Sequence, residues 1–302
     1  MSETRRIVEW RKHWIGIGLC ACAAVAIGCG GAASGRGASH STIRVEGSDT
    51  MVNVAQAWAE EYHQREPDIS VQVLGGGSGV GIASLIDGNC DMANSSRMMK
   101  GEELEKTQSR RGSPAIAHTV GFDAMGIYVH PSNPIERISL PELAAIFGEH
   151  PTVTRWSELG ITLPPGVPDR IIRVSRQNSS GTYTYFREHV LGKGKDMGLG
   201  SLDANGSKDA VALVSRTPCS IGYSGMGYAT SEVKMVPVSK EAGQPGVAPT
   251  IENAKNGTYP ITRPLLIYTA GEPTGYAGEY LKWILSSDGQ EIVRQLGYVP
   301  VD

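Results

Sequence analysis

Residues 43–86 read IRVEGSDTMVNVAQAWAEEYHQREPDISVQVLGGGSGVGIASLI, in which one local pattern occurs twice: an apolar strand, a loop of small polar residues and an amphipathic helix. Ile43 to Glu46 predicts the first strand, and Gly47 to Thr50 predicts a turn and helix cap. The helix that follows presents one apolar face, because its large apolar residues recur at helical spacing: Met51, Val54, Trp58 and Tyr62. Pro67 ends that helix. Ile69 to Leu74 predicts the second strand, which runs into the loop Gly75 to Gly81 and a helix through Ile82, Leu85 and Ile86.

The same pattern occurs twice more. Asp91 to Ala93 predicts a strand that is followed by Asn94-Ser95-Ser96-Arg97 and a charged helix around Glu102 to Lys106. Farther along, a strand at Ile171 to Val174 runs into Arg176-Gln177-Asn178-Ser179-Ser180-Gly181-Thr182 and a helix from Tyr183 to Val190. Strands that alternate with helices in this way predict an α/β fold.

The rest of the chain gives weaker patterns. The other predicted elements are two extended runs in Ala115 to His130 broken near Gly121, a helix capped by Ser139 and Glu142, a helix from Lys208 to Ser215, a strand from Ile221 to Tyr223, an irregular loop from Pro237 to Gly257, a strand from Pro264 to Tyr268, and two helices ending at Leu296.

The N-terminus has the pattern of an export signal. Four basic residues, Arg5, Arg6, Arg11 and Lys12, precede an uncharged stretch from Trp14 to Gly28, which is shorter than the roughly 20 residues of a membrane-spanning helix. We therefore predict a signal peptide at residues 1–28. Ala26-Ile27-Gly28-Cys29 is similar to a bacterial lipoprotein processing site, which makes Cys29 the predicted lipidation site and residues 29–42 a tether. Cys22 in Leu19-Cys20-Ala21-Cys22 is a competing site, and an ordinary signal without a lipid is the alternative.

Composition limits the kind of protein. The chain has 302 residues, 40% of them hydrophobic and 20% charged, which is typical of a soluble globular protein. Removing the leader, with four basic and two acidic residues, changes the formal net charge from −3 to −5. Such an acidic protein is a poor nucleic-acid binder. Cys90 and Cys219 are the cysteines that remain outside the leader region, and we expect both to be free and buried.

The four loops share a chemistry that suits an anion. The first N–H groups of a helix point outward with a partial positive charge, glycine lets the backbone approach closely, and hydroxyls add donors. Arg176 adds a fixed guanidinium that matches tetrahedral oxyanions, although an arginine beside a helix start can also be a surface ion pair. Nucleotide-binding, nucleophile-elbow and zinc-protease motifs are missing, so we predict a binding protein that is not an enzyme and needs no cofactor or metal.

At these residues the chain resembles the phosphate-specific solute-binding proteins of bacterial ABC importers. The resemblance extends from Ile43 to Val301 and is carried by four segments: Gly47-Ser48-Asp49-Thr50-Met51, Gly76-Gly77-Ser78-Gly79, Asp91 to Arg97, and Arg176 to Thr182. It implies a two-lobed periplasmic-binding-protein type II fold that closes on a dehydrated phosphate. The expected lobes are residues 43–124 with 263–302, and residues 125–262.

The resemblance also implies the phosphate ligands: Thr50, Met51, Ser78, Ser96, Arg176, Ser180, Gly181 and Thr182. Some family members have aspartate where this chain has Ser96, and that carboxylate accepts the proton of hydrogen phosphate. Here the acceptor is expected to be Asp49 or Asp123, unless Asp49 is only an N-cap and Asp123 only a turn residue. Arg97 either adds a second positive charge or neutralises a neighbouring carboxylate.

The expected function is therefore extracytoplasmic binding of inorganic phosphate and its delivery, by cleft closure, to an ABC permease in the inner membrane. The protein is expected to be a monomer, anchored by its lipid in the periplasm or at the cell surface. The alternatives are a carrier of sulfate, molybdate or tungstate, a secreted phosphate-ester hydrolase, and a surface lipoprotein that serves as an adhesin or sensor.

Overall fold

The computed structural model describes residues 41–301, so the predicted leader, Cys29 and most of the predicted tether lie outside the described residues. The strands are β1 (Ser41–Gly47), β2 (Ile69–Leu74), β3 (Met92–Ser95), β4 (Ala115–Val129), β5 (Ile138–Ser139), β6 (Ile172–Arg176), β7 (Leu202–Ala204), β8 (Ser220–Gly225), β9 (Lys234–Val236), β10 (Val238–Ser239) and β11 (Thr262–Ala270). The α-helices are α1 (Val52–Arg65), α2 (Ser78–Asp87), α3 (Gly101–Arg111), α4 (Leu140–Phe147), α5 (Gly181–Phe186), α6 (Ser207–Ser215), α7 (Ile251–Lys255), α8 (Gly275–Ile284) and α9 (Ser287–Gln295). The predicted α/β fold class is confirmed.

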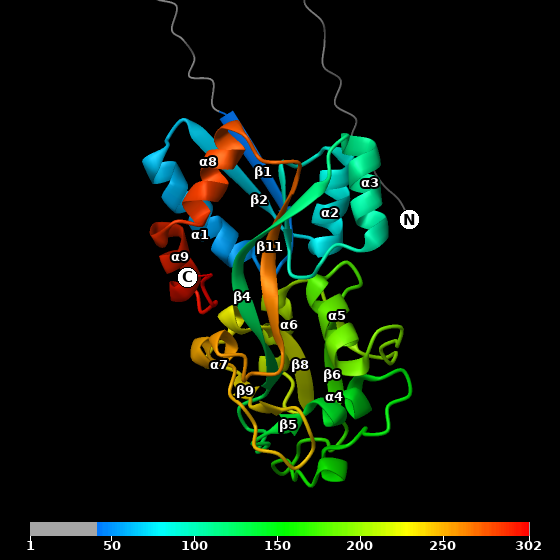
Figure 1. Cartoon of the computed structure of the whole chain (residues 1–302). Helices are drawn as coiled ribbons and strands as arrows, with labels where there is room; N and C mark the ends of the chain where they lie inside the picture. Colours follow the sequence, from blue (N-terminus) through cyan, green and yellow to red (C-terminus); the bar gives the residue numbers. More distant parts are fainter. Residues whose placement is uncertain (1–40, 302) are drawn as a thin grey trace, which may run out of the picture. The chain divides into compact units, whose positions relative to one another are not determined.

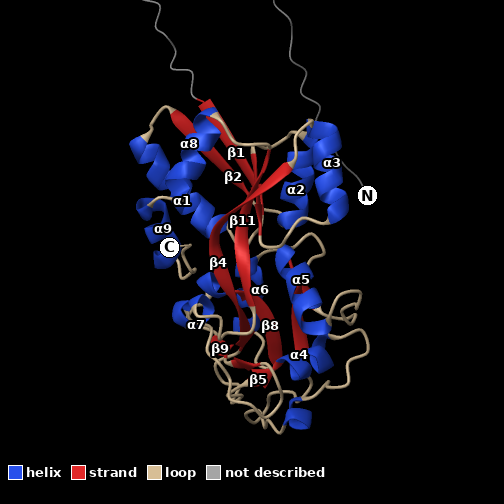
Figure 2. Ribbon diagram, in the orientation of Figure 1, coloured by secondary structure: helices blue, strands red, loops and turns tan. Residues whose placement is uncertain are grey.

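One long strand joins two halves of the sheet. The strand order is β2-β1-β3-β11-β4-β8-β6-β7, and β9 also pairs with β4. Strand β4 pairs with β11 from Ala115 to Ala124 and then with β8 from Met125 to Val129. The partner of β4 therefore changes between Ala124 and Met125, and β4 and β11 run through the middle of the fold in Figures 1 and 2.

Helices cover both faces of each half (Figure 1). In the first half, α1, α8 and α9 bury one core that includes Trp58, Tyr280 and Ile284, while α2 packs a second core on the other face around Leu85. In the second half, α4 and α5 share a core with Phe147, and α6 covers the opposite face. Burial on both faces explains why the strand residues of β8 are all buried.

The topology brings the predicted loops to one place. Strands β1, β2 and β3 are parallel neighbours, so their carboxyl ends lie at one edge of the sheet, where the loops before α1 and α2 begin. Strand β6 ends at Arg176, and the loop after it opens α5. Backbone contact joins the two sets, because Gly79 N donates to Ser179 O at 2.9 Å.

Three predicted elements differ from the structure. Strand β4 is continuous, and the expected break near Gly121 is a shift of register opposite Leu265 and Leu266. The predicted irregular loop from Pro237 to Gly257 contains β10 and α7. The helix predicted from Tyr183 to Val190 is α5 followed by a π-helical turn at Arg187–Leu191.

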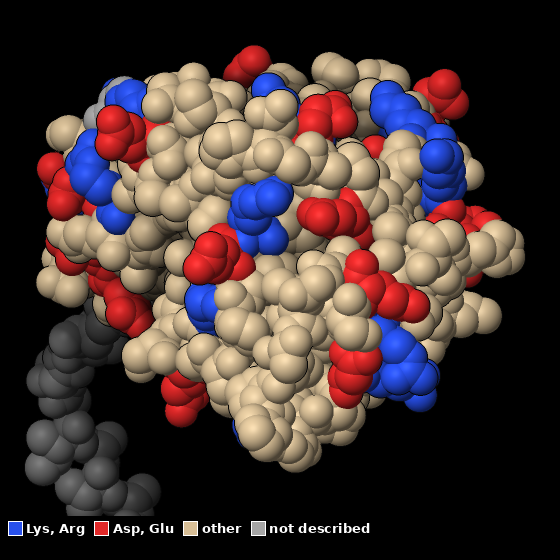
Figure 3. Space-filling model, turned by 90° about the horizontal axis from the view of Figure 1, so that it is seen from below, with Lys and Arg blue, Asp and Glu red and all other residues tan. Residues whose placement is uncertain are grey.

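Cys90 and Cys219 are free and buried, as expected. Among residues 41–301, no helix is both long and apolar enough to cross a bilayer. On the face in Figure 3, lysine and arginine side chains are interspersed with aspartate and glutamate, so this face has no continuous basic surface of the kind that binds nucleic acid.

Candidate functional site

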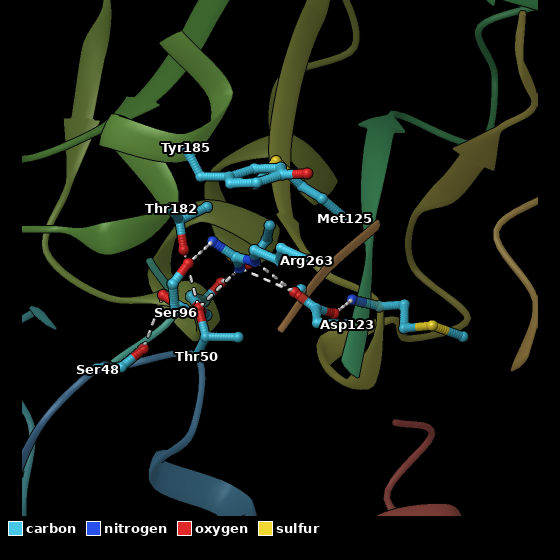
Figure 4. Close-up of polar contacts among 12 residues, drawn as sticks. Ser48, Thr50, Ser96, Asp123, Met125, Thr182, Tyr185 and Arg263 are labelled. Carbon is cyan, nitrogen blue, oxygen red and sulfur yellow. Dashed lines mark hydrogen bonds and ion pairs between the residues drawn. The ribbon is translucent and has the colours of Figure 1, made fainter. Parts of the chain in front are cut away.

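Hydroxyl groups from both halves of the sheet meet where the loops converge. Thr50 Oγ1 lies 2.8 Å from Thr182 Oγ1, which joins the start of α1 to the start of α5. Ser96 Oγ lies 3.4 Å from Ser78 Oγ and accepts a hydrogen bond from Ser48 Oγ at 3.0 Å. All five side chains belong to residues that are at most 2% exposed, and Figure 4 shows four of them pointing toward one another. The predicted ligands Thr50, Ser78, Ser96 and Thr182 therefore lie together.

Gly181 fits between these hydroxyls because it has no side chain. A Cβ atom at this position would lie 2.2 Å from Ser78 Oγ and 2.7 Å from Ser96 Oγ. Ser180 has a different geometry, since its hydroxyl accepts from the backbone N–H groups of Thr182 and Tyr183 and so caps α5. The hydroxyl of Ser180 therefore holds the loop in shape.

Met51 lies at the start of α1 with its side chain in the core. It is fully buried, and its N–H donates to Ser48 O at 2.9 Å. That bond closes the turn before α1. The backbone donor of Met51 is thus used within its own loop, as are those of Ser180 and Thr182.

A second arginine, which the sequence pattern did not reveal, lies at the centre of the cluster. Arg263 of β11 donates to Thr50 Oγ1 at 3.1 Å and to Ser96 O at 3.4 Å. It also donates to Asp123 Oδ2 from Nε at 3.0 Å and from Nη2 at 2.8 Å. The guanidinium is fully buried, and Figure 4 shows it between Thr50 and Asp123.

Asp123 is inside strand β4, so the turn-residue alternative is wrong. Its carboxylate is fully buried, where it binds Arg263 through Oδ2 and accepts from Met226 N at 3.0 Å through Oδ1. A buried carboxylate needs such partners to remain charged. The pair places one negative and one positive group beside the hydroxyl cluster.

Arg176 lies at the end of β6 and is 1% exposed, so the surface ion-pair alternative is wrong. Its Nη2 donates to Asp49 Oδ2 at 3.0 Å, and its Nη1 donates to Ser207 Oγ at 3.0 Å. Its Nε is buried without a hydrogen-bond partner. Burial lowers the pKa of Arg176 from its ordinary value of 12.5, and the nearby Asp49 opposes that change.

Asp49 joins the two halves and does not cap α1. Its Oδ1 accepts from Gly76 N at 2.8 Å, while the cap position of α1 is Met51 without a side-chain hydrogen bond. The main-chain oxygen of Asp49 also accepts from the hydroxyl of Tyr228 at 2.6 Å. The N-cap alternative for Asp49 is therefore wrong.

Arg97 neutralises a carboxylate, which was one of the two roles expected for it. Its Nη1 and Nη2 bind the two oxygens of Glu103 at 2.8 and 2.7 Å. Both side chains are largely buried. Since its charge is matched by that of Glu103, Arg97 adds little to the field at the hydroxyl cluster.

The site combines two buried guanidinium groups with short hydroxyl donors, which suits a small tetrahedral anion. Each arginine is held by one aspartate, and these four residues come from the loops or strands of both halves. Among residues 41–301, no group of three histidine, cysteine, aspartate or glutamate side chains is arranged to hold a metal ion.

Comparison with known proteins agrees with this geometry. The family model of the PBP superfamily domain matches residues 32–288. The phosphate-binding protein PstS of Pseudomonas aeruginosa is 35% identical over 279 residues, which cover 89% of this chain and 85% of the relative. The chain belongs to the PstS family of the PBP superfamily. A second PstS relative, the phosphate-binding protein of Bacillus subtilis, is 32% identical and matches 89% of the chain and 84% of its own length.

Solved structures give the same assignment for this PstS family member. One described as a phosphate ABC transporter substrate-binding protein with bound phosphate, from Clostridium perfringens, has a TM-score of 0.76 and 28% identity, and covers 86% of this chain and 100% of its own. An ABC-type phosphate transport receptor from Vibrio cholerae has a TM-score of 0.67 and 26% identity, with coverage of 85% and 99%. The two-lobed fold of the family is thus the fold of this chain.

Proposed function

We propose that this chain binds inorganic phosphate outside the cytoplasm and delivers it to an ABC permease in the inner membrane. The observation that carries the proposal is the convergence of Arg176, Arg263 and the hydroxyls of Thr50 and Thr182 from both halves of the sheet. The names of its PstS relatives and of its structural neighbours support the same ligand. No covalent chemistry is assigned to the chain.

In this proposal the lobes are residues 43–124 with 263–302, and residues 125–262. The change of strand pairing in β4 between Ala124 and Met125 supports the first crossing, and the start of β11 at Thr262 supports the second. Each crossing is a single stretch of chain, which suits a hinge. Closure would bring the two sets of loops onto the ligand and exclude water.

The proposed ligands are the residues predicted from the sequence, to which we add Arg263. The predicted residues are Thr50, Met51, Ser78, Ser96, Arg176, Ser180, Gly181 and Thr182. We assign the proton-accepting role to Asp123, because it is fully buried and binds Arg263, which in turn donates to Thr50 Oγ1 in the cluster. Asp49 instead holds Arg176. A carboxylate here disfavours fully ionised sulfate.

Cellular placement is also part of the proposal. Processing at Cys29 would leave a lipid-anchored protein in the periplasm or at the cell surface, acting as a monomer. Palmitate labelling of the protein in an export-competent bacterium tests this, since Cys29→Ser should abolish the label and Cys22→Ser should not. Label that persists in Cys29→Ser contradicts the assignment.

The deciding experiment is calorimetry of purified protein that has been stripped of endogenous ligand, titrated with phosphate and then with sulfate. We expect heat with phosphate and much less with sulfate. Arg176→Ala should weaken phosphate binding by about 100-fold, because each charge-assisted hydrogen bond contributes about 1.5–3 kcal/mol. Asp123→Asn should reduce the difference in affinity between phosphate and sulfate.

The matched control is Arg65→Ala, which removes a half-exposed arginine that pairs with Asp288 on the surface. It should leave the phosphate affinity unchanged. Heat with sulfate or molybdate and none with phosphate would overturn the assigned ligand.

A further inference from the structure

Tyr185 of α5 contacts Thr262 and Arg263, at the point where the chain crosses into β11. Its hydroxyl donates to Thr262 O at 2.6 Å, and its ring lies under the Arg263 guanidinium, with 5.8 Å from Cζ to the ring centroid. Figure 4 shows the ring alongside Arg263 and away from the hydroxyl cluster. Burial raises the pKa of Tyr185 above its ordinary value of 10.0, so the phenol stays protonated and remains a donor.

One turn later on the same helix face, His189 continues this contact. Its ring stacks on that of Tyr185, with centroids 5.3 Å apart and planes at 12°. Its Nε2 lies 2.7 Å from Pro260 O, which can only accept. Tyr185 and His189 thus bind two carbonyls of the segment 260–262, which immediately precedes Arg263.

The two contacts of Tyr185 restrain Arg263 at both ends. The hydrogen bond to Thr262 O fixes the backbone that leads into Arg263, and the ring face attracts its guanidinium. Arg263 in turn donates to Thr50 Oγ1 and to Ser96 O. The same helix opens with Gly181 and Thr182, so one rigid element carries part of the ligand loop and orients the arginine of the opposite half.

We propose that Tyr185 is a positioning residue that holds the Arg263 guanidinium in the anion site. His189 supports Tyr185 in this role by stacking on its ring and binding Pro260 O in the hinge segment 260–262. This role rests on the proposed phosphate-binding function. It concerns a residue outside the loops that carry the family resemblance, and it acts on Arg263 rather than on the ligand.

Substitutions separate the hydroxyl from the ring. Tyr185→Phe keeps the ring and loses the bond to Thr262 O, so phosphate affinity should fall by about 3-fold. Tyr185→Leu loses both contacts, so phosphate affinity should fall by about 10-fold or more. The control is Tyr183→Leu, the same change two residues earlier. Tyr183 packs beside the same core, but its charged neighbours are Arg187, Asp196 and Asp203, so Tyr183→Leu should leave phosphate affinity within about 2-fold of the wild type.

A double-mutant cycle then tests whether Tyr185 acts through Arg263. In an Arg263→Gln background, Tyr185→Leu should no longer reduce phosphate affinity, because the group that it positions is gone. If Tyr185→Leu costs the same factor in both backgrounds, or binds like the wild type, the positioning role is wrong.

Thermal melts without phosphate are then recorded for the four proteins of the cycle: the wild type, Tyr185→Leu, Arg263→Gln and the double variant. If Tyr185 and Arg263 are coupled, the losses in Tm should be non-additive. This arm separates two failures. A wild type that gives no heat with phosphate overturns the proposed function, whatever the cycle shows. Additive losses in Tm overturn the contact between Tyr185 and Arg263, whatever the ligand proves to be.

Discussion

At the scale of single residues, the Arg97–Glu103 pair shows how a buried charge is held. Glu103 accepts from Arg97 and also from Lys100 N at 2.7 Å. Burial alone would raise the pKa of Glu103, but the hydrogen bonds from Arg97 and from the Lys100 N–H outweigh it and lower the pKa below its ordinary value of 4.5. The folded protein therefore prefers the ionised carboxylate.

Glu103→Gln should reduce the free energy of unfolding by about 2 kcal/mol at pH 7, because it leaves the charge of Arg97 buried without a partner. A lowered carboxyl pKa stabilises the fold above the pKa of the unfolded state, and this contribution is lost as the pH falls through the folded-state pKa. The difference in the free energy of unfolding between the wild type and Glu103→Gln should thus shrink in acid, below pH 4.5. Urea unfolding at several pH values measures it.

The neighbouring residue provides the control. Glu102 pairs with Lys106 on the surface, where both side chains are more than half exposed, so Glu102→Gln should have little effect at any of these pH values. An equal loss of unfolding free energy in both variants, or a loss in Glu103→Gln that does not change with pH, would contradict the stabilising role of the Arg97–Glu103 pair.

The same scale shows what could be predicted of the site. Thr50, Ser78, Gly181 and Thr182 can be predicted because each lies in a glycine- or hydroxyl-rich loop before a helix, a local pattern with a physical reason. Arg263 has no such pattern, since it sits within β11 next to Pro264. Its only signal is a charge at the start of an otherwise apolar strand, and its partners are far away in the chain. Residues positioned by tertiary contact alone are beyond local sequence patterns.

At the scale of elements, the capping box of α4 is a prediction that the structure confirms. Glu142 N donates to Ser139 Oγ, and Ser139 N donates back to Glu142 Oε2 at 2.7 Å. Ser139→Ala should reduce the free energy of unfolding by about 1 kcal/mol, the usual contribution of an N-cap hydroxyl. Glu142→Gln keeps an acceptor for Ser139 N and should cost less. Thermal melts rank the two variants, and the reverse order would mean that the carboxylate dominates the cap.

Two other elements, β4 and β10, show where sequence patterns do not predict the secondary structure correctly. The run from Ala115 to Val129 contains Gly121, and glycine interrupts a strand pattern. Strand β4 nevertheless stays continuous there, because its pairing with β11 absorbs the irregularity as a shift of register. The segment from Pro237 to Gly257 has the composition of a loop, but β10 forms there by pairing with β5. Both errors come from tertiary contacts that override local preference.

At the scale of the whole fold, the α/β class follows from the four repeated strand–loop–helix units, because parallel strands must place those loops at shared edges. How closely the two halves approach depends on a few atoms. Gly77 has φ of 99°, and a Cβ there would lie 2.6 Å from Ser179 O in the other half. Ser179 Oγ also donates to Gly76 O at 3.0 Å, so this contact joins the halves beside the proposed ligand site.

Gly77→Ala should therefore hold the halves apart and weaken phosphate binding by about 10-fold or more, equivalent to about 1.4 kcal/mol lost from the closed form. Gly76→Ala is a matched control in the same loop: its φ is 115°, but an added Cβ would meet only the Val80 side chain, at 3.5 Å or more. Both variants carry the backbone strain of a side chain at positive φ, whereas only Gly77→Ala meets the other half. Small-angle scattering should then show phosphate compacting the wild type and Gly76→Ala but not Gly77→Ala. Equal compaction in all three proteins would mean that this contact does not limit closure.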